Sequence, residues 1–189
     1  RSEDQHKLDK SKTELYAKSA EYYRRFIERF PKKPISFDMN YFLADIELID
    51  LKQYERAANH YQNVVEMWKD EIYPKDAKKK EVKSMVQDAA FGRVNAYDKL
   101  VQKHHEDSIL VKMANYEQKH GEALQEATQE EEGPPSEQDR IPKQKLLEYE
   151  KGFVKASDQY SEMFPDTDVT PTVDFVAAEV YKARGHYAE

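Results

Sequence analysis

Apolar residues recur at intervals of three and four along most of the chain, which is the spacing that places side chains on one face of an α-helix. The clearest run covers residues 36–68, where two apolar sets are separated at residues 50–53 by a break without Pro or Gly. So short a break predicts a tight corner between two antiparallel helices. The first set comprises Met39, Phe42, Leu43, Ile46 and Ile49, and the second comprises Tyr54, Ala57, Ala58, Tyr61, Val64, Val65 and Trp68.

The same spacing predicts further helices before and after this pair. Proline cannot continue a helix, so Phe30-Pro31 and Phe164-Pro165 mark two helix ends. We expect Ser36 to cap the helix that follows the first of these ends. Strand-like alternation is missing from the sequence, so the predicted fold class is all-α. The expected helices cover 13–29, 36–50, 53–71, 81–103, 109–131, 143–163 and 170–184, with a break after Lys103 at residues 104–107.

One domain over 1–189 accounts for this order of helices. Residues 12–74 carry the most regular pattern, and 75–131 form a more diverged helix pair. A Gly- and Pro-rich loop follows over 132–142, because such residues punctuate helices. A further helix pair is expected over 143–189.

Composition removes several classes of function. The net charge of −7 argues against a nucleic-acid-binding protein, which usually presents a basic face. The chain has no cysteine, so disulfides and thiolate metal sites are excluded. Neither a Gly-rich phosphate loop nor a G-x-S-x-G or H-E-x-x-H motif is present, and His104 and His105 point about 100° apart on a helix. We therefore expect no enzyme activity, no cofactor and no metal. No apolar run is long enough to span a membrane.

The residue types around the corner at 50–53 resemble the second half of a tetratricopeptide (TPR) repeat. In that family a small residue precedes the corner, and an aromatic, a small and a second aromatic residue follow it; here these are Ala44, Tyr54, Ala57 and Tyr61. The interval from Ala44 to Tyr54 is one residue longer than usual, which suggests a longer first helix or an altered corner. Related positions occur upstream at Tyr16, Ser19, Tyr23, Phe26 and Pro31, and downstream at Ala156, Tyr160, Phe164, Pro165, Ala177, Ala178, Tyr181, Gly185 and Tyr187.

This resemblance implies a right-handed α-α superhelix, a TPR-like solenoid of antiparallel helix pairs. Such a stack curves around a concave face, which in this family the first helix of each pair lines. An acidic residue at Asp45 and Glu179 would repel a C-terminal carboxylate, so the expected partner is a basic or extended peptide. The residues expected on the concave face are Asp38, Tyr41, Asp45 and Leu48, then Ala89, Arg93 and Ala96, and finally Glu179 and Lys182.

The function implied is a non-catalytic protein–protein interaction or scaffolding module within a larger multi-repeat protein. An alternative is a helical accessory or sensor domain with a small-molecule or metal site. Self-association through exposed repeat ends is a third possibility. The Phe-Pro helix ends and the tyrosine-rich helices resemble TPR proteins of the bacterial cell envelope, which favours the periplasm or envelope over the cytoplasm.

Overall fold

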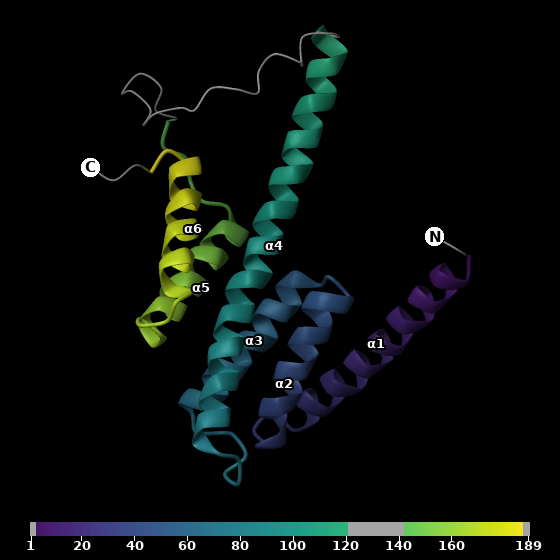
Figure 1. The fold of residues 1–189 in the computed structure, drawn as a ribbon, viewed down its shortest axis with the longest axis vertical. Helices are drawn as coiled ribbons and strands as arrows, with labels where there is room; N and C mark the ends of the chain where they lie inside the picture. Colours follow the sequence, from purple (N-terminus) through teal and green to yellow (C-terminus); the bar gives the residue numbers. More distant parts are fainter. Residues whose placement is uncertain (1–2, 121–141, 187–189) are drawn as a thin grey trace.

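The chain forms helices joined by short connections (Figure 1). The structure, a computed structural model, describes the backbone of residues 3–120 and 142–186 and the side chains of residues 10–105 and 142–186. Within those ranges no strand occurs, which confirms the all-α class. The helices are α1 (Glu3–Arg29), α2 (Ile35–Asp45), the π-helical turn η1 (Ile46–Asp50), α3 (Tyr54–Lys69), α4 (Lys79–His120), α5 (Glu148–Met163) and α6 (Thr170–Ala183).

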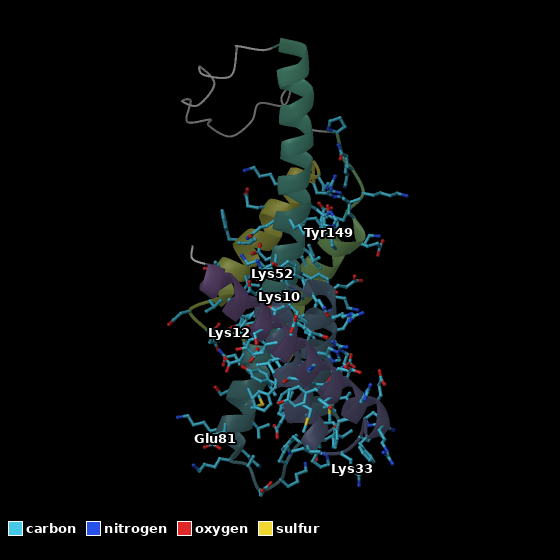
Figure 2. All side chains as sticks on the ribbon, turned by 90° about the vertical axis from the view of Figure 1, so that its right-hand side faces the viewer. Lys10, Lys12, Lys33, Lys52, Glu81 and Tyr149 are labelled. Atoms are coloured by element: carbon cyan, nitrogen blue, oxygen red, sulfur yellow. The ribbon has the colours of Figure 1, made fainter. Side chains whose placement is uncertain are left out.

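Each helix packs against the next one along the chain, from α1 on α2 to α5 on α6, and α2 also touches α4. In Figure 1 the N-terminal part of α1 stands apart from α2, and residues 10–19 of α1 are exposed. The C-terminal end of α4 projects beyond the other helices in both views (Figures 1 and 2). The core therefore lies along α2, α3, the first part of α4, α5 and α6.

The predicted corner between α2 and α3 is present, but α2 does not stay α-helical up to it. The backbone N–H of Leu51 donates to Ile46 O at 3.0 Å, an i→i+5 bond, and Lys52 then takes a positive φ of 53°. A π-turn holds one residue more than an α-turn. The segment before the corner therefore holds one residue more than a regular α-helical turn would.

The buried face of α2 differs from the face predicted by hydrophobicity. Phe42 and Ile49 are 47% and 67% exposed, although both belong to the predicted apolar set. The polar residues Asn40 and Glu47 are buried instead, because hydrogen-bonding partners from α1 and α3 meet them. The whole buried set of this segment is Ser36, Phe37, Asn40, Leu43, Ala44 and Glu47.

The predicted helix break at residues 104–107 is wrong, since α4 continues through it to His120. Two side chains at this point are held by α5 rather than left free. The His104 ring stacks on Tyr149 at 4.3 Å, and His105 Nε2 lies 3.9 Å from Glu150 Oε1. The remainder of the expected helix and most of the predicted loop, residues 121–141, lie outside the described residues, as does Tyr187.

The helix predicted from residue 143 begins later, at Glu148. The preceding segment is bound to the end of α6, where the N–H of Gln144 donates to Arg184 O at 2.8 Å. The N–H of Leu147 donates to Glu150 Oε2 at 2.7 Å, which satisfies a donor at the helix start. These bonds hold residues 143–147 outside the helix.

The corners after α1 and α5 share one geometry. Ser36 Oγ donates to Phe30 O at 2.6 Å, and Thr170 Oγ1 donates to Phe164 O at 2.6 Å. The hydroxyl therefore closes the end of the preceding helix, and Ser36 is not the N-cap that we predicted, because α2 begins at Ile35. Both corners satisfy a terminal carbonyl in the same way.

Aromatic rings one helical turn apart contact each other at a tilt just before each corner. Phe26 and Phe30 have ring centroids 5.1 Å apart, and Tyr160 and Phe164 have centroids 5.5 Å apart. Counted from the shared hydroxyl, these pairs occupy the same positions. The pairs α1–α2 and α5–α6 are therefore two versions of one local structure.

Glycine permits close approach at two helix contacts. A Cβ on Gly92 of α4 would lie 2.6 Å from Cζ of Tyr61 on α3. A Cβ on Gly152 of α5 would likewise run into the ring of Tyr97 on α4. In both places a tyrosine ring occupies the space that a side chain would need.

Candidate functional site

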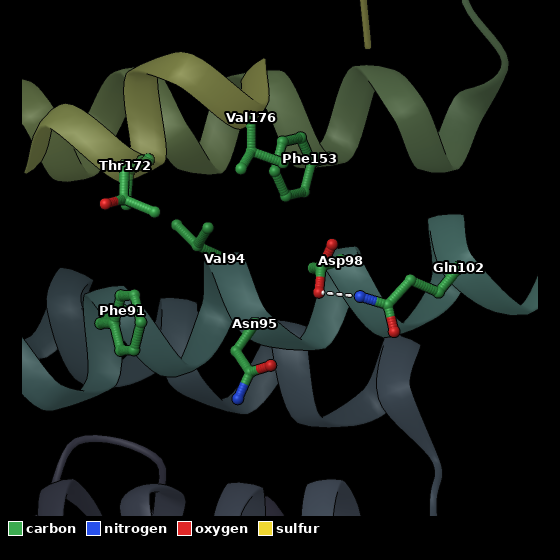
Figure 3. Close-up of a pocket in the computed structure, with 9 residues that line it drawn as sticks. Phe91, Val94, Asn95, Asp98, Gln102, Phe153, Thr172 and Val176 are labelled. Carbon is green, nitrogen blue, oxygen red and sulfur yellow. Dashed lines mark hydrogen bonds between the residues drawn. The ribbon is translucent and has the colours of Figure 1, made fainter. Parts of the chain in front are cut away.

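Two cavities lie along α4. The upper cavity has a volume of about 380 Å³ and lies between α4, α5 and α6 (Figure 3). The lower cavity, about 230 Å³, lies between α4, α2 and the connection before α4. The upper one is lined by Phe91, Val94, Asn95, Asp98, Gln102, Phe153, Thr172, Val173 and Val176. The lower one is lined by Phe37, Asp38, Pro74, Asp76, Ala77, Glu81, Val82 and Met85.

One set of α4 residues connects the two cavities. We call it the α4 stripe and define it as Glu81, Met85, Asp88, Asn95, Asp98 and Gln102. Its members recur at intervals of three, four or seven, which keeps them on one side of the helix. The ends of the stripe line the cavities, and Asp88 lies between them.

The upper cavity combines an apolar floor with a polar rim. Phe153 and Val173 are 1% and 3% exposed and form part of the floor. On the rim, Gln102 Nε2 donates to Asp98 Oδ2 at 2.6 Å, as the dashed line in Figure 3 shows. Ligand sites in proteins commonly combine an apolar lining with a few polar groups of this kind.

Carboxylates crowd the side of α4 that faces α2. Burial raises the pKa of Asp38 above its ordinary value, and the nearby charge of Asp76 raises it further. Burial also raises the pKa of Asp45; the hydrogen bond from Tyr61 opposes the shift and the charge of Asp88 adds to it. Burial is the larger cause of both shifts, and like charges held close together add to it.

Asp98 carries a related shift at the other end of the stripe. Burial raises its pKa, although the charge of Lys99 and the hydrogen bond from Gln102 act in the opposite direction. Among the described residues that line the two cavities, none is Lys or Arg. The carboxylates that attract positive charge are Asp38, Asp76 and Glu81 at the lower cavity and Asp98 at the upper one.

Of the residues predicted on the concave face, those of α2 lie where this helix meets α3 and α4. Asp38 lines the lower cavity, and Asp45 Oδ1 accepts a hydrogen bond from Tyr61 at 2.5 Å. The ring of Tyr41 is 6.2 Å from that of Tyr61. Leu48, which belongs to η1, is half-buried against the core. Asp38 thus lines the lower cavity, and the charge of Asp88 in the α4 stripe acts on Tyr41 and Asp45.

Arg93, the residue predicted on α4, lies between helices. Its side chain is 7% exposed, and Nη1 donates to Gln159 Oε1 of α5 at 2.6 Å. Ala89 and Ala96, expected beside it, are fully buried. The cavity-lining residues Asn95 and Asp98 come two positions after Arg93 and Ala96, and two residues turn a helix by about 200°. The expected face of α4 is therefore the one that packs inside.

Glu179 and Lys182 are exposed on α6 and pair with each other, with Lys182 Nζ 3.4 Å from Glu179 Oε1. Neither lines a cavity; Thr172, Val173 and Val176 do so instead. Sequence reasoning missed these residues, and it missed Phe91, Asn95, Asp98 and Gln102. The sequence does contain a signal for the α4 residues, because polar and apolar residues recur at intervals of three, four or seven along one side of this helix.

A second polar cluster lies buried between α1, η1 and α3. Glu47 is fully buried, accepts from Arg24 Nε at 3.3 Å, and leaves Oε2 without a hydrogen bond. Burial raises the pKa of Glu47, and Arg24 counteracts that shift. His60 Nδ1 lies 3.0 Å from Asn40 Oδ1, while its Nε2 is 3.7 Å from Glu47 Oε2.

The imidazole of this cluster is neutral near pH 7. Burial lowers the pKa of His60 to about 4, and the charges of Arg24 and Arg56 add to the effect. Burial and these positive charges outweigh the attraction of Glu47. His60 Nε2 and Glu47 Oε2, 3.7 Å apart, therefore do not form an ion pair at neutral pH. The cluster links α1, α2, η1 and α3 through Arg24, Asn40, Glu47 and His60.

A third polar cluster connects both ends of the α5–α6 pair. Glu150 is 1% exposed and accepts from Arg184 at 2.7 to 2.9 Å and from the N–H of Leu147. Burial alone would raise the pKa of Glu150, but the bonds from Arg184 and Leu147, with the charge of His105, bring it below its ordinary value. This carboxylate is fully paired.

Metal ligands do not gather in the described part of the chain, where no group of three or more His, Asp or Glu side chains could hold an ion. None of the helices that the structure describes is long and apolar enough to cross a membrane. Comparison with protein-family models, curated proteins and solved structures gave no match. The likeness to TPR repeats therefore remains a resemblance.

Proposed function

We propose that the chain is a non-catalytic interaction module that binds a basic, partly apolar peptide segment along the α4 stripe. The observation that carries this proposal is the pair of cavities on one helix, acidic along its length and apolar at the upper floor. A partner with alternating Lys or Arg and apolar side chains complements both properties.

We also propose the finer fold: a TPR-like solenoid in which α2, α4 and α6 are the first helices of successive pairs. Sequential packing, the matching corners at Ser36 and Thr170, and the tyrosine–glycine contacts support it. In that arrangement the α4 stripe lies on the concave face, between α2 and α6. An extended peptide would follow the face across the three helices.

The test compares three synthetic peptides of about twelve residues, one alternating Lys and Leu, one alternating Glu and Leu, and one of Gly and Ser. Fluorescence anisotropy with the basic peptide should give saturable binding that weakens as salt is raised. Asp88→Lys and Asp98→Lys should each weaken it about tenfold, because a repulsive charge replaces an attractive one.

Glu28→Lys is the matched control, since Glu28 is an exposed residue of α1 and the charge change is identical. It should leave the affinity almost unchanged. Equal binding of the basic and acidic peptides would contradict the proposal. So would a Glu28→Lys effect as large as that of Asp98→Lys.

A second candidate function is the binding of a small apolar molecule in the upper cavity. Its volume of about 380 Å³ falls within the usual range for ligand sites, about 300–1,000 Å³. Val176→Trp would fill this cavity and abolish such binding, whereas Asp88→Lys would leave it unchanged. Binding that Asp88→Lys weakens strongly and Val176→Trp leaves unchanged would instead identify the peptide site.

A further inference from the structure

The exposed face of α6 corresponds to the face of α2 that α3 covers. The hydroxyls of Ser36 and Thr170 occupy the same place in the two corners, so they set a common register for α2 and α6. In that register, Asn40, Tyr41, Ala44 and Asp45 of α2 correspond to Asp174, Phe175, Ala178 and Glu179 of α6.

On α2 these four positions make the contact with α3. Asn40 Oδ1 accepts from Asn63 Nδ2 at 3.1 Å, and Asp45 Oδ1 accepts from Tyr61. Tyr41 packs edge-on against the ring of Tyr61, and Ala44 is fully buried. The contact thus consists of a small residue, an aromatic residue and two acceptors.

On α6 the same kinds of side chain are present and open. Asp174, Ala178 and Glu179 are exposed, and Phe175 is 65% exposed. Asp174 accepts one bond from Ser161 Oγ, and a carboxylate has room for more. The cavity-lining residues of α6 are different ones, so this face is separate from the proposed peptide site.

We propose that the α6 face, defined as Asp174, Phe175, Ala178 and Glu179, docks an amphipathic helix of the α3 type. The chemistry of this partner follows from the contact that α3 makes. It places small residues, like Ala57 and Ala58, at the helix contact, and a tyrosine four residues after the first of them. The tyrosine packs on Phe175 and donates its hydroxyl to Glu179. Docking continues the order of packing that α1, α2 and α3 already have.

The probe is a peptide with the sequence of α3, residues 54–69. A helix of 16 residues is marginal by itself in water, so a hydrocarbon staple joins the exposed positions 55 and 59. Fluorescence anisotropy with the intact protein should show saturable binding. Ala178→Glu and Phe175→Glu should each weaken it about tenfold or more, because they place a charge in the contact.

Ile49→Glu is the matched control, because Ile49 is 67% exposed and Phe175 is 65% exposed. It should leave binding unchanged, and a peptide with Tyr61→Ala should bind about tenfold more weakly. Lack of saturable binding, or binding that Ala178→Glu leaves intact, would overturn the proposal. It would also be overturned by self-association that Ala178→Glu abolishes while the peptide fails to bind.

Discussion

The pairs α1–α2 and α5–α6 have the same corner but different surroundings. Ser36 and Thr170 make the same hydroxyl-to-carbonyl bond, and each follows a pair of aromatic rings in tilted contact. The face of α2 that carries Asn40, Tyr41, Ala44 and Asp45 is covered by α3, whereas the corresponding face of α6 is exposed. Local sequence therefore determines the corner, and the neighbouring helix determines which residues become core.

The two pairs also differ in how a buried glutamate joins their helices. In the first, Arg24 of α1 bonds to Glu47 in η1 at 3.3 Å, and one carboxylate oxygen has no hydrogen bond. In the second, Glu150 of α5 bonds to Arg184 after α6 at 2.7 to 2.9 Å. The comparison indicates that the second ion pair stabilises its helices more than the first does.

The largest expected difference between the pairs comes from one substitution at corresponding positions. Ala44→Glu should cost about 3–5 kcal/mol or prevent folding, because it places an unpaired charge at a buried helix contact. Ala178→Glu should change the free energy of unfolding by less than about 0.5 kcal/mol, since the position is exposed. Urea unfolding followed by circular dichroism measures both; equal effects would contradict the different burial of the two positions.

Glutamine substitution should separate the two buried carboxylates. Glu150→Gln should cost about 2 kcal/mol, because it removes charge-assisted bonds to Arg184. Glu47→Gln should cost less than about 0.5 kcal/mol, since its ionised form is poorly satisfied and the amide can donate toward His60. Urea unfolding at neutral pH provides the comparison, and a larger loss for Glu47→Gln would reverse our interpretation.

The glutamine variants also predict opposite pH dependence. The pKa of Glu150 is lowered in the fold, so its contribution is present above the unfolded pKa of 4.5 and is lost as pH falls. The pKa of Glu47 is raised in the fold, so its buried carboxylate costs stability at neutral pH. That cost is lost as pH falls and the carboxyl group takes up a proton. The stability difference between wild type and Glu150→Gln should therefore shrink in acid.

His60 gives the α1–α3 region a further pH dependence, of a sign set by its lowered pKa. The unfolded imidazole has a pKa of 6.5 and takes up a proton as pH falls, whereas the folded one, at about 4, stays neutral. Falling pH therefore favours the unfolded chain. His60→Asn, which keeps a donor near Asn40, should remove about 2 kcal/mol of stability loss between about pH 7.5 and pH 5.

The measurement is urea unfolding of both proteins at the two pH values. Asn59→His is the matched control, because it adds an exposed imidazole beside the buried one. It should leave the pH dependence of stability unchanged. If wild type and His60→Asn lose equal stability, the buried imidazole does not titrate as described.

The smallest effect tests the corners themselves. Ser36→Ala and Thr170→Val should each cost about 1 kcal/mol, because each leaves a terminal carbonyl without its hydroxyl donor. Similar losses in thermal unfolding would confirm that the corners are energetically alike. A loss at only one of them would show that the shared geometry has different roles in the two pairs.

Sequence periodicity predicted the all-α class, the corner at residues 50–53 and most helix ends. It did not predict that α4 runs through His104, because the partners of His104 and His105 lie on α5, far away in sequence. Nor did it predict burial of Asn40 and Glu47, since a hydrophobic pattern carries no information about hydrogen-bonding partners.

The kinds of residue in the candidate site were predictable from the sequence, but the side of α4 on which they lie was not. Acidic residues near α2 were expected, and Asp38 does line a cavity. Arg93 was placed on the open side because the sequence does not say which side of α4 meets α5. That choice depends on Gly152 and Gln159, which contact α4 only in the folded chain.

The most direct test of the account is to map the basic peptide on the isotope-labelled protein by NMR. The account predicts peptide-induced amide shifts centred on α4 residues 81–102 and on α6 residues 172–176, reduced by Asp98→Lys. Shifts confined to α1, or shifts that Asp98→Lys leaves unchanged, would contradict binding along the α4 stripe.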